Sequence, residues 1–147
     1  MKRILAIVFA TLIAPGLAAQ SDEGAPRTKL TQPAGDSDLS EFLWTNRPIV
    51  VFADSPADPR YIEQMERLQD RHDMLADRDV VILTDTDPKA GSVLRKKLRP
   101  RGFMLVLVGK DGEVKLRKPL PWTVREITRS IDKNPERERE INRRRGF

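Results

Sequence analysis

The sequence predicts an α/β domain with one four-stranded mixed sheet and helices on both of its faces. Three segments, 49–53, 79–84 and 103–108, are almost continuously apolar, as strands buried on both faces are. The stretches between them carry helix-start signals, so strands and helices alternate along the chain. An Asp-Gly turn and an alternating segment then follow, which indicates a fourth, antiparallel strand. The 147 residues allow one such domain.

The first 19 residues have the anatomy of a cleaved secretory signal. Two basic residues precede the apolar stretch 4–14, and Ala18 and Ala19 offer two positions for cleavage. The stretch is shorter than the roughly 20 residues that span a bilayer, so we expect no transmembrane span after cleavage. We therefore expect an exported protein, periplasmic or secreted. Residues 20–35, rich in Pro, Gly, Ser, Thr and charge, are expected to form a disordered linker.

Composition limits the partners and the chemistry. The chain has 27 basic and 22 acidic residues, and loss of the signal would remove two of the basic ones, leaving a net charge of about +3. An exported protein with so small a charge is not expected to bind nucleic acid. The chain contains no cysteine, which excludes disulfide bonds and thiol chemistry.

The first buried strand leads into a long helix. Ser55-x-x-Asp58 fits a capping box, and Asp58-Pro59 fits an N-cap followed by proline at the first helical position. From Arg60 to about Asp77 apolar residues recur every three or four positions, which predicts one buried stripe. The residues of this stripe are Tyr61, Met65, Leu68, His72 and Leu75.

The other elements are read from the same signals. Residues 36–44 are expected to form a short helix or arm, in which Trp44 is interpreted as a packing residue. After the second strand the chain predicts a helix over 88–98, the strand 103–108, a turn at 109–113, an edge strand at 114–117 and a last helix over 124–133. The resulting order, β-α-β-α-β-β-α, is that of a thioredoxin-like fold. We expect residues 36–134 to form this domain and residues 135–147 to form a charged C-terminal tail.

Four segments resemble the domain-of-unknown-function family 4174, whose members are mostly small exported bacterial proteins. They are 44–55 (WTNRPIVVFADS), 58–60 (DPR), 105–117 (LVLVGKDGEVKLR) and 131–137 (IDKNPER), and the resemblance extends over roughly 42–140. The family is related to thioredoxins and peroxiredoxins, so the resemblance implies their fold and export. It implies no activity. Where thioredoxins carry Cys-x-x-Cys, this chain has Pro56 and Pro59, and where they carry a cis-proline it has Arg101-Gly102.

Other catalytic and metal sites are not indicated. A Ser55–His72 pair would be separated by about 20 Å along the predicted helix, too far for a triad. One histidine and no cysteine exclude an ordinary zinc site. Asp85-x-Asp87 starts like a calcium loop, but Pro88 interrupts it. We therefore expect no metal and no cofactor.

Two sets of residues are candidates for binding. The first set lies where a thioredoxin-like fold contacts its ligands: Asp54, Ser55, Asp58, Arg101 and Gly102. In this set Asp54 could alternatively act as a general acid or base. The second set is a cluster of cations that could contact an anion or simply favour the end of a helix: Arg95, Lys96, Lys97 and Arg99.

The preferred interpretation is an exported, non-redox binding or scaffold module of the cell envelope. Its partner would be an envelope protein or an anionic polymer. Two alternatives stay open, a hydrolase-type enzyme that uses Asp54 and a polyanion-binding protein that uses the Arg95–Arg101 cluster. The sequence identifies neither the ligand nor the oligomeric state.

Overall fold

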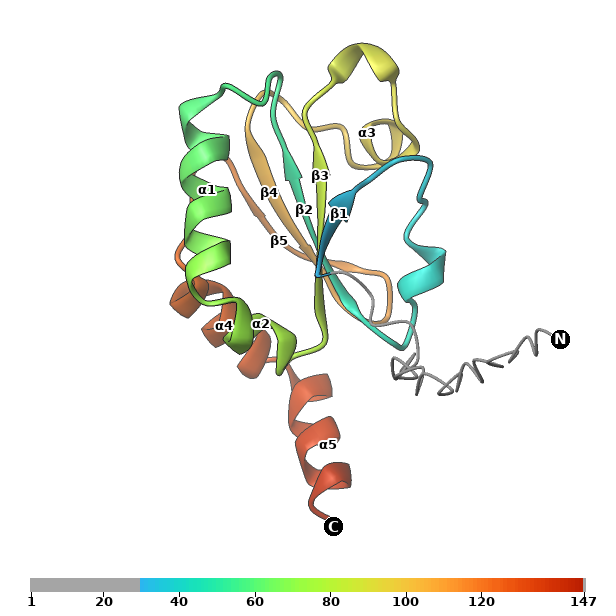
Figure 1. Cartoon of the computed structure of the whole chain (residues 1–147). Helices are drawn as coiled ribbons and strands as arrows, with labels where there is room; N and C mark the ends of the chain where they lie inside the picture. Colours follow the sequence, from blue (N-terminus) through green and yellow to red (C-terminus); the bar gives the residue numbers. More distant parts are fainter. Residues whose placement is uncertain (1–29, 147) are drawn as a thin grey trace, which may run out of the picture.

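A computed structural model describes residues 30–146. The predicted signal peptide and residues 20–29 of the predicted linker lie outside this range. The described chain forms a five-stranded mixed sheet with strand order β1-β3-β2-β4-β5 (Figure 1). The strands are β1 Thr31–Pro33, β2 Arg47–Phe52, β3 Val80–Asp85, β4 Met104–Val108 and β5 Val114–Lys118.

The prediction of four strands was wrong, because β1 adds a fifth at the edge of the sheet. It pairs in parallel with β3, with Thr31 opposite Ile82. The three residues of β1 lie in the segment predicted to be a disordered linker, and two of them are exposed. Polar residues can form this strand because it is held through its backbone, as in the 2.5 Å hydrogen bond from Ile82 N to Leu30 O.

The three inner strands of the sheet, β3, β2 and β4, correspond to the three apolar segments of the sequence. β2 and β3 are parallel, and β2 and β4 are antiparallel with Val50 opposite Val106. β4 and β5 form an antiparallel hairpin through the predicted Asp-Gly turn. Every residue of β2 is buried. The sheet is therefore covered on both sides over its centre.

The helices differ from the predicted ones at two breaks. They are α1 Pro59–Asp70, α2 His72–Ala76, α3 Val93–Leu98, α4 Val124–Asp132 and α5 Pro135–Arg144, with short 3-10 helices η1 Ser40–Phe42 and η2 Pro88–Ala90. The first predicted helix is split at Arg71, whose backbone is not helical (φ −129°, ψ 41°). His72 is consequently exposed rather than part of the buried stripe. The second predicted helix is split by Gly91, which adopts φ 56° after η2.

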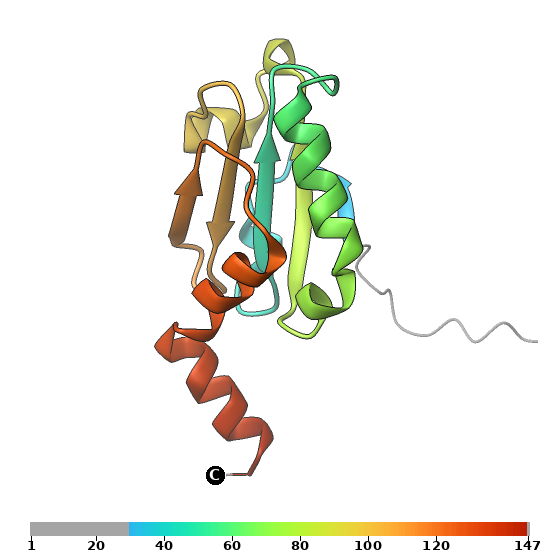
Figure 2. The same cartoon turned by 90° about the vertical axis from the view of Figure 1, so that its left-hand side faces the viewer.

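Two apolar layers fill the space between helices and sheet. α1, α2 and α4 cover one face (Figure 2), where Leu68, Ile127 and Val51 belong to the first buried cluster. η1 and α3 cover the other face, where Phe42 and Leu94 belong to the second buried cluster. The prediction of helices on both faces is thus correct. Within residues 30–146 no helix is long and apolar enough to cross a membrane.

The predicted C-terminal tail is an ordered helix as far as the structure describes it. Asn134 caps α5 by accepting a hydrogen bond from Glu136 N (3.1 Å). Two of its charged residues, Arg137 and Glu140, are buried against the domain. Buried ion pairs therefore attach α5 to the domain, even though its sequence has almost no apolar residues.

Candidate functional site

The predicted binding residues at the end of β2 form a polar corner with the loop before β4. Asp54 and Ser55 are exposed in the turn that follows β2. Gly102 adopts φ 59°, and a Cβ at this position would lie 4.0 Å from Asp54 Oδ2. Asp58 caps α1 by accepting from Arg60 N (2.9 Å). The structure therefore brings Asp54 and Gly102 together, while Arg101 is exposed beside them.

Arg60 is the residue of this corner that the sequence analysis did not single out. Its guanidinium forms a two-point contact with Asp58, Nε to Oδ1 at 3.3 Å and Nη2 to Oδ2 at 3.1 Å. The hydrogen bond from Arg60 holds the pKa of the Asp58 carboxyl below its usual value. The guanidinium carbon also lies 5.7 Å from the centre of the Phe103 ring. The Asp58-x-Arg60 spacing at a helix start was the available signal.

Arg95, predicted to contact an anionic ligand, is engaged inside the protein instead. Its Nε donates to Asp85 Oδ1 (2.9 Å) and its Nη2 to the backbone oxygen of Ala53 (2.6 Å). Ser92 Oγ donates to the other oxygen of Asp85 (2.6 Å). The side chains of Arg95 and Asp85 are 11% and 7% exposed. The sequence does not reveal this contact, because the carboxylate that pairs with Arg95 ends β3, ten positions earlier.

The remaining cations of the predicted cluster lie in solvent. Lys96, Lys97, Arg99 and Arg101 are all exposed. Lys97 Nζ donates to the backbone oxygen of Asp38 (3.1 Å), which joins α3 to the segment before η1. Arg99 ends α3 in a left-handed conformation. These residues suit the negative end of the α3 dipole, whether or not they meet an anion.

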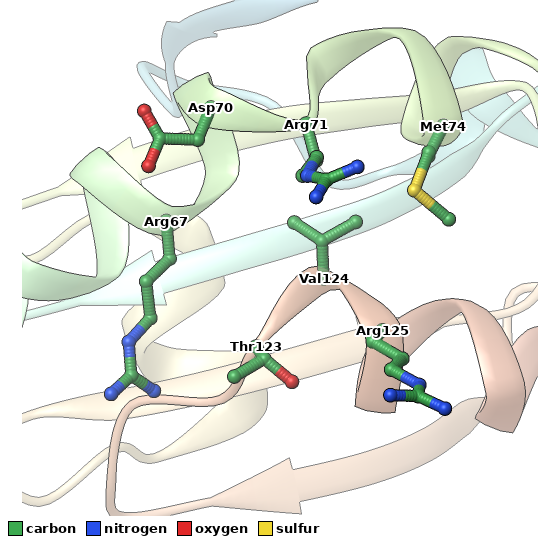
Figure 3. Close-up of a pocket in the computed structure, with 7 residues that line it drawn as sticks. All are labelled: Arg67, Asp70, Arg71, Met74, Thr123, Val124 and Arg125. Atoms are coloured by element: carbon green, nitrogen blue, oxygen red, sulfur yellow. The ribbon is translucent and has the colours of Figure 1, made fainter.

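A groove that the sequence analysis did not anticipate lies between the α1–α2 break and the start of α4 (Figure 3). Its volume is about 410 Å³. We call it the arginine groove, and it is lined by Arg67, Asp70, Arg71, Met74, Thr123, Val124 and Arg125. Val124 is buried and Met74 is half-buried, so the groove has an apolar base between three guanidinium groups. Three arginines and one aspartate give it a net charge of +2.

Hydrogen bonds fix the wall of the arginine groove. Gln64 is fully buried and clamps the chain before α4, with Nε2 donating to Trp122 O (3.0 Å) and Oε1 accepting from Trp122 N (2.8 Å). Thr123 and Glu126 then form a capping box at the start of α4. These contacts hold the first turn of α4 against α1 without the help of a ligand.

The three arginines differ in the hydrogen bonds and ion pairs that their guanidinium groups form within the protein. Arg67 forms an ion pair with Glu63 at 2.5 Å and donates to Pro121 O at 3.0 Å. Arg71 and Arg125 are exposed, and within residues 30–146 their side chains form no ion pair. Two guanidinium groups of the groove are therefore available to an anion. Their positions in the sequence give no signal, because only folding brings the α1–α2 break next to the start of α4.

The polar corner and the arginine groove present charged and polar side chains. Within residues 30–146 no group of three or more His, Cys, Asp or Glu side chains could hold a metal ion. A Cβ at Gly102 would lie 3.8 Å from Arg60 Nη2 and 4.0 Å from Asp54 Oδ2, which places both side chains beside this loop.

Comparisons with known proteins agree with this architecture. The family profile described as domain of unknown function (DUF4174) matches residues 38–140. No curated protein gives a significant match. Among solved structures, the reduced 2-Cys peroxiredoxin of Plasmodium vivax has a TM-score of 0.53 at 14% identity, over 74% of this chain and 85% of its own.

Two further structures show the same likeness. A malarial protein has a TM-score of 0.51 at 14% identity, over 61% of this chain and 98% of its own. An N-terminally modified Plasmodium yoelii Prx1a has a TM-score of 0.51 at 17% identity, over 74% of this chain and 82% of its own. At these identities the likeness shows the thioredoxin-like fold and nothing about activity.

Proposed function

The chain belongs to the DUF4174 family, and from this membership and its fold we propose that it is an exported binding module without redox activity. The partner we propose is an envelope protein. It would present a carboxylate next to an apolar side chain to the arginine groove.

The absence of cysteine supports the first part of this proposal, the lack of redox activity. A thioredoxin-like fold that reduces disulfides or peroxides needs a thiolate nucleophile. This chain has no cysteine at any of its 147 positions. The corner in question holds two prolines and the Asp58–Arg60 ion pair instead. What the fold retains is a rigid scaffold that can present surfaces to a partner.

The shape and charge of the arginine groove support the second part, the binding of a partner protein's carboxylate in this groove. Ligand sites typically combine an apolar base with a few convergent polar groups. Here Val124 and Met74 supply the base, and Arg71 and Arg125 supply unpaired guanidinium groups, which bind carboxylates through two parallel hydrogen bonds. A volume of about 410 Å³ suits one or two side chains of a protein better than a polymer strand.

The polar corner serves as a second candidate contact. Asp54, Ser55, Asp58, Arg101 and Gly102 lie at the carboxyl ends of the parallel strands, where α/β proteins commonly contact ligands. The alternative of a hydrolase that uses Asp54 is less well supported, because this carboxylate is exposed and lacks a catalytic partner. The alternative of a polyanion-binding protein is less well supported, because Arg95 of its cation cluster is already paired with Asp85.

Partner capture with matched variants tests the proposal. The chain from residue 20 to 147 is cross-linked in a native envelope fraction, as wild type and as Arg71→Glu/Arg125→Glu. We expect the reversed charges to lower the yield of the specific partner at least about tenfold, because they repel its carboxylate. Arg129→Glu serves as the control, since Arg129 is exposed on α4 but does not line the groove.

Two results would count against the proposal. Equal capture by wild type and by the charge-reversed variant would remove the arginine groove as the site. If a purified sample hydrolyses a substrate and loses this turnover in Asp54→Asn, the module is an enzyme. For the corner as second contact, we expect Arg101→Glu, a change at an exposed position, to reduce capture without changing the fold.

A further inference from the structure

A second groove lies at the opposite end of the sheet from the polar corner. It is formed by the turn before β2 and by α5, which projects past the amino ends of β2 and β3 (Figure 1). Its volume is about 560 Å³. We call it the Trp44 groove, and it is lined by Trp44, Lys110, Glu136, Arg139, Glu140, Arg143 and Arg144. We propose that the Trp44 groove binds a uronate, the acidic pyranose unit of an anionic glycan.

The first observation is the exposure of Trp44. The sequence predicts that Trp44 packs against the domain, but 73% of the residue is exposed. Its backbone adopts φ 63°, which is unfavourable for a bulky residue. Strain of this kind persists only where surrounding contacts fix it, and it concentrates at functional sites. The indole therefore needs an explanation other than core packing.

The contacts that fix this turn come from the hairpin of β4 and β5. Trp44 N donates to the backbone oxygen of Lys110 (2.8 Å). Leu43 Cδ2 approaches Gly112 so closely that a Cβ there would be 2.8 Å away. The hairpin thus holds the backbone of Trp44 and the side chain of its preceding neighbour Leu43, and Trp44 lines the groove.

The second observation is the ion-pair network that joins α5 to the domain. Lys110 Nζ lies 2.8 Å from Asp79 Oδ2 and 3.2 Å from Glu140 Oε1. Glu140 Oε1 also pairs with Arg47 (2.7 Å), and Asp79 Oδ2 with Arg144 (2.9 Å). Both walls of the groove are consequently fixed before a ligand arrives, which lowers the entropic cost of binding.

The third observation is that some polar groups of the groove have no partner. Arg139 and Arg143 are exposed, and within residues 30–146 neither side chain takes part in an ion pair. They are four positions apart on α5 and so lie on the same face of the helix. Glu136 Oε2 is buried without a hydrogen-bond partner. A buried acceptor of this kind calls for a donor.

Together these groups match an acidic sugar. The flat face of an indole packs against the C–H bonds of a pyranose ring. Guanidinium groups at Arg139 and Arg143 suit a single carboxylate, and Glu136 suits a sugar hydroxyl, which donates. A nucleotide could also stack on Trp44. We favour the uronate because Glu136 and Glu140 oppose the additional negative charge of a polyphosphate.

Calorimetric titration with defined sugars tests this proposal on residues 20–147. The probes are trigalacturonate, its neutral counterpart galactotriose, inorganic phosphate and ADP. We expect trigalacturonate to bind at least about tenfold more tightly than any of the other three. Trp44→Ala and Arg139→Gln/Arg143→Gln are each expected to weaken its binding at least about tenfold. Arg129→Gln on α4 is the matched control and should leave it unchanged.

The outcomes separate this site from the proposed protein-binding function. Absence of trigalacturonate binding, equal binding of galactotriose, or tighter binding of phosphate or ADP would each overturn the uronate proposal. So would full binding by Trp44→Ala, whose exposed side chain makes loss of the fold unexpected and whose circular dichroism checks this. The Arg71→Glu/Arg125→Glu variant should bind trigalacturonate normally, so failure of one proposal leaves the other standing.

Discussion

The ionisation of Glu140 is strongly coupled to the folded state. Its side chain is 10% exposed and that of Arg47, its partner, is 3% exposed. Burial alone would raise the pKa of Glu140, but hydrogen bonds from Arg47 and Arg137, the charge of Arg47 and contact with Lys110 lower it to about 2. Proton binding by Glu140 therefore favours the unfolded chain.

This difference predicts how stability depends on pH. Because the pKa of Glu140 falls from an ordinary 4.5 to about 2 on folding, its contribution is complete above pH 4.5 and is lost as the pH falls toward 2. A shift of this size corresponds to a contribution on the order of 3 kcal/mol to the free energy of unfolding. Urea unfolding measured between neutral pH and pH 2.5 should show this loss in the wild type.

Glu140→Gln provides the control for the pH dependence. The variant lacks the titrating group, so its stability should be lower at neutral pH and should change less below pH 4.5 than that of the wild type. If the wild type and Glu140→Gln lose stability in parallel below pH 4.5, then Glu140 does not carry the acid sensitivity.

At the scale of single elements, α3 is fixed to the sheet by a polar cluster rather than by apolar packing alone. Leu94 and Leu98 are its buried apolar residues. Asp85 at the end of β3 accepts from Ser92, which caps α3, and from Arg95 one turn later. Arg95 also lies 5.5 Å from the centre of the Phe52 ring. The cluster therefore connects β2, β3 and α3.

We expect Arg95→Ala to destabilise the protein by about 3 kcal/mol, because it leaves the Asp85 carboxylate buried without its partner. Lys96→Ala is the matched control on the same helix. Lys96 is exposed, and its removal should change the free energy of unfolding by less than about 0.5 kcal/mol. Urea unfolding monitored by circular dichroism measures both. Equal stability of the two variants would contradict a structural role for Arg95.

At the scale of the whole molecule, local sequence predicts those elements whose burial is continuous. β2 and β4 carry unbroken apolar runs, and both lie in the centre of the sheet as predicted. β1 could not be recognised, because Thr31–Pro33 carries no apolar pattern and is defined by pairing with β3. The α1–α2 break at Arg71 was likewise hidden within a periodic apolar pattern.

The candidate sites were predicted less well than the fold, for a physical reason. The corner of Asp54 and Gly102 follows from the ends of two recognisable strands, so the fold prediction placed it. The arginine groove depends on Arg125 of α4 meeting Arg71 of the α1–α2 break, and no local spacing reveals such a contact. The same holds for Arg95, which reads as a surface cation until its contact with Asp85 is known.

The fate of residues 1–19 is a prediction about the whole protein, and these residues lie outside the described range. If they direct export, the protein recovered outside the cytoplasm should begin at Ala19 or Gln20, because Ala18 and Ala19 are the expected cleavage positions. N-terminal sequencing of the secreted or periplasmic protein measures this. Val8→Asp, which interrupts the apolar stretch, should leave the protein uncleaved and inside the cell. Export of an intact chain that begins at Met1 would contradict the prediction.

The last prediction concerns whether α5 is part of the folding unit. The sequence places the end of the domain at residue 134, whereas the family match continues to residue 140 and α5 buries Arg137 and Glu140. A chain that ends at Asn134 lacks the Glu140 carboxylate. Arg47 would then be buried without its ion-pair partner, and Lys110 would keep one of its two carboxylate partners. We expect this truncation to lower the free energy of unfolding by at least about 3 kcal/mol, the typical effect of removing one partner from a buried ion pair. A chain that ends at Arg144 keeps all of these contacts and should unfold at the urea concentration of the full chain. If both truncated chains are equally stable, α5 is an appendage, and the rigid wall that the Trp44 groove requires does not exist.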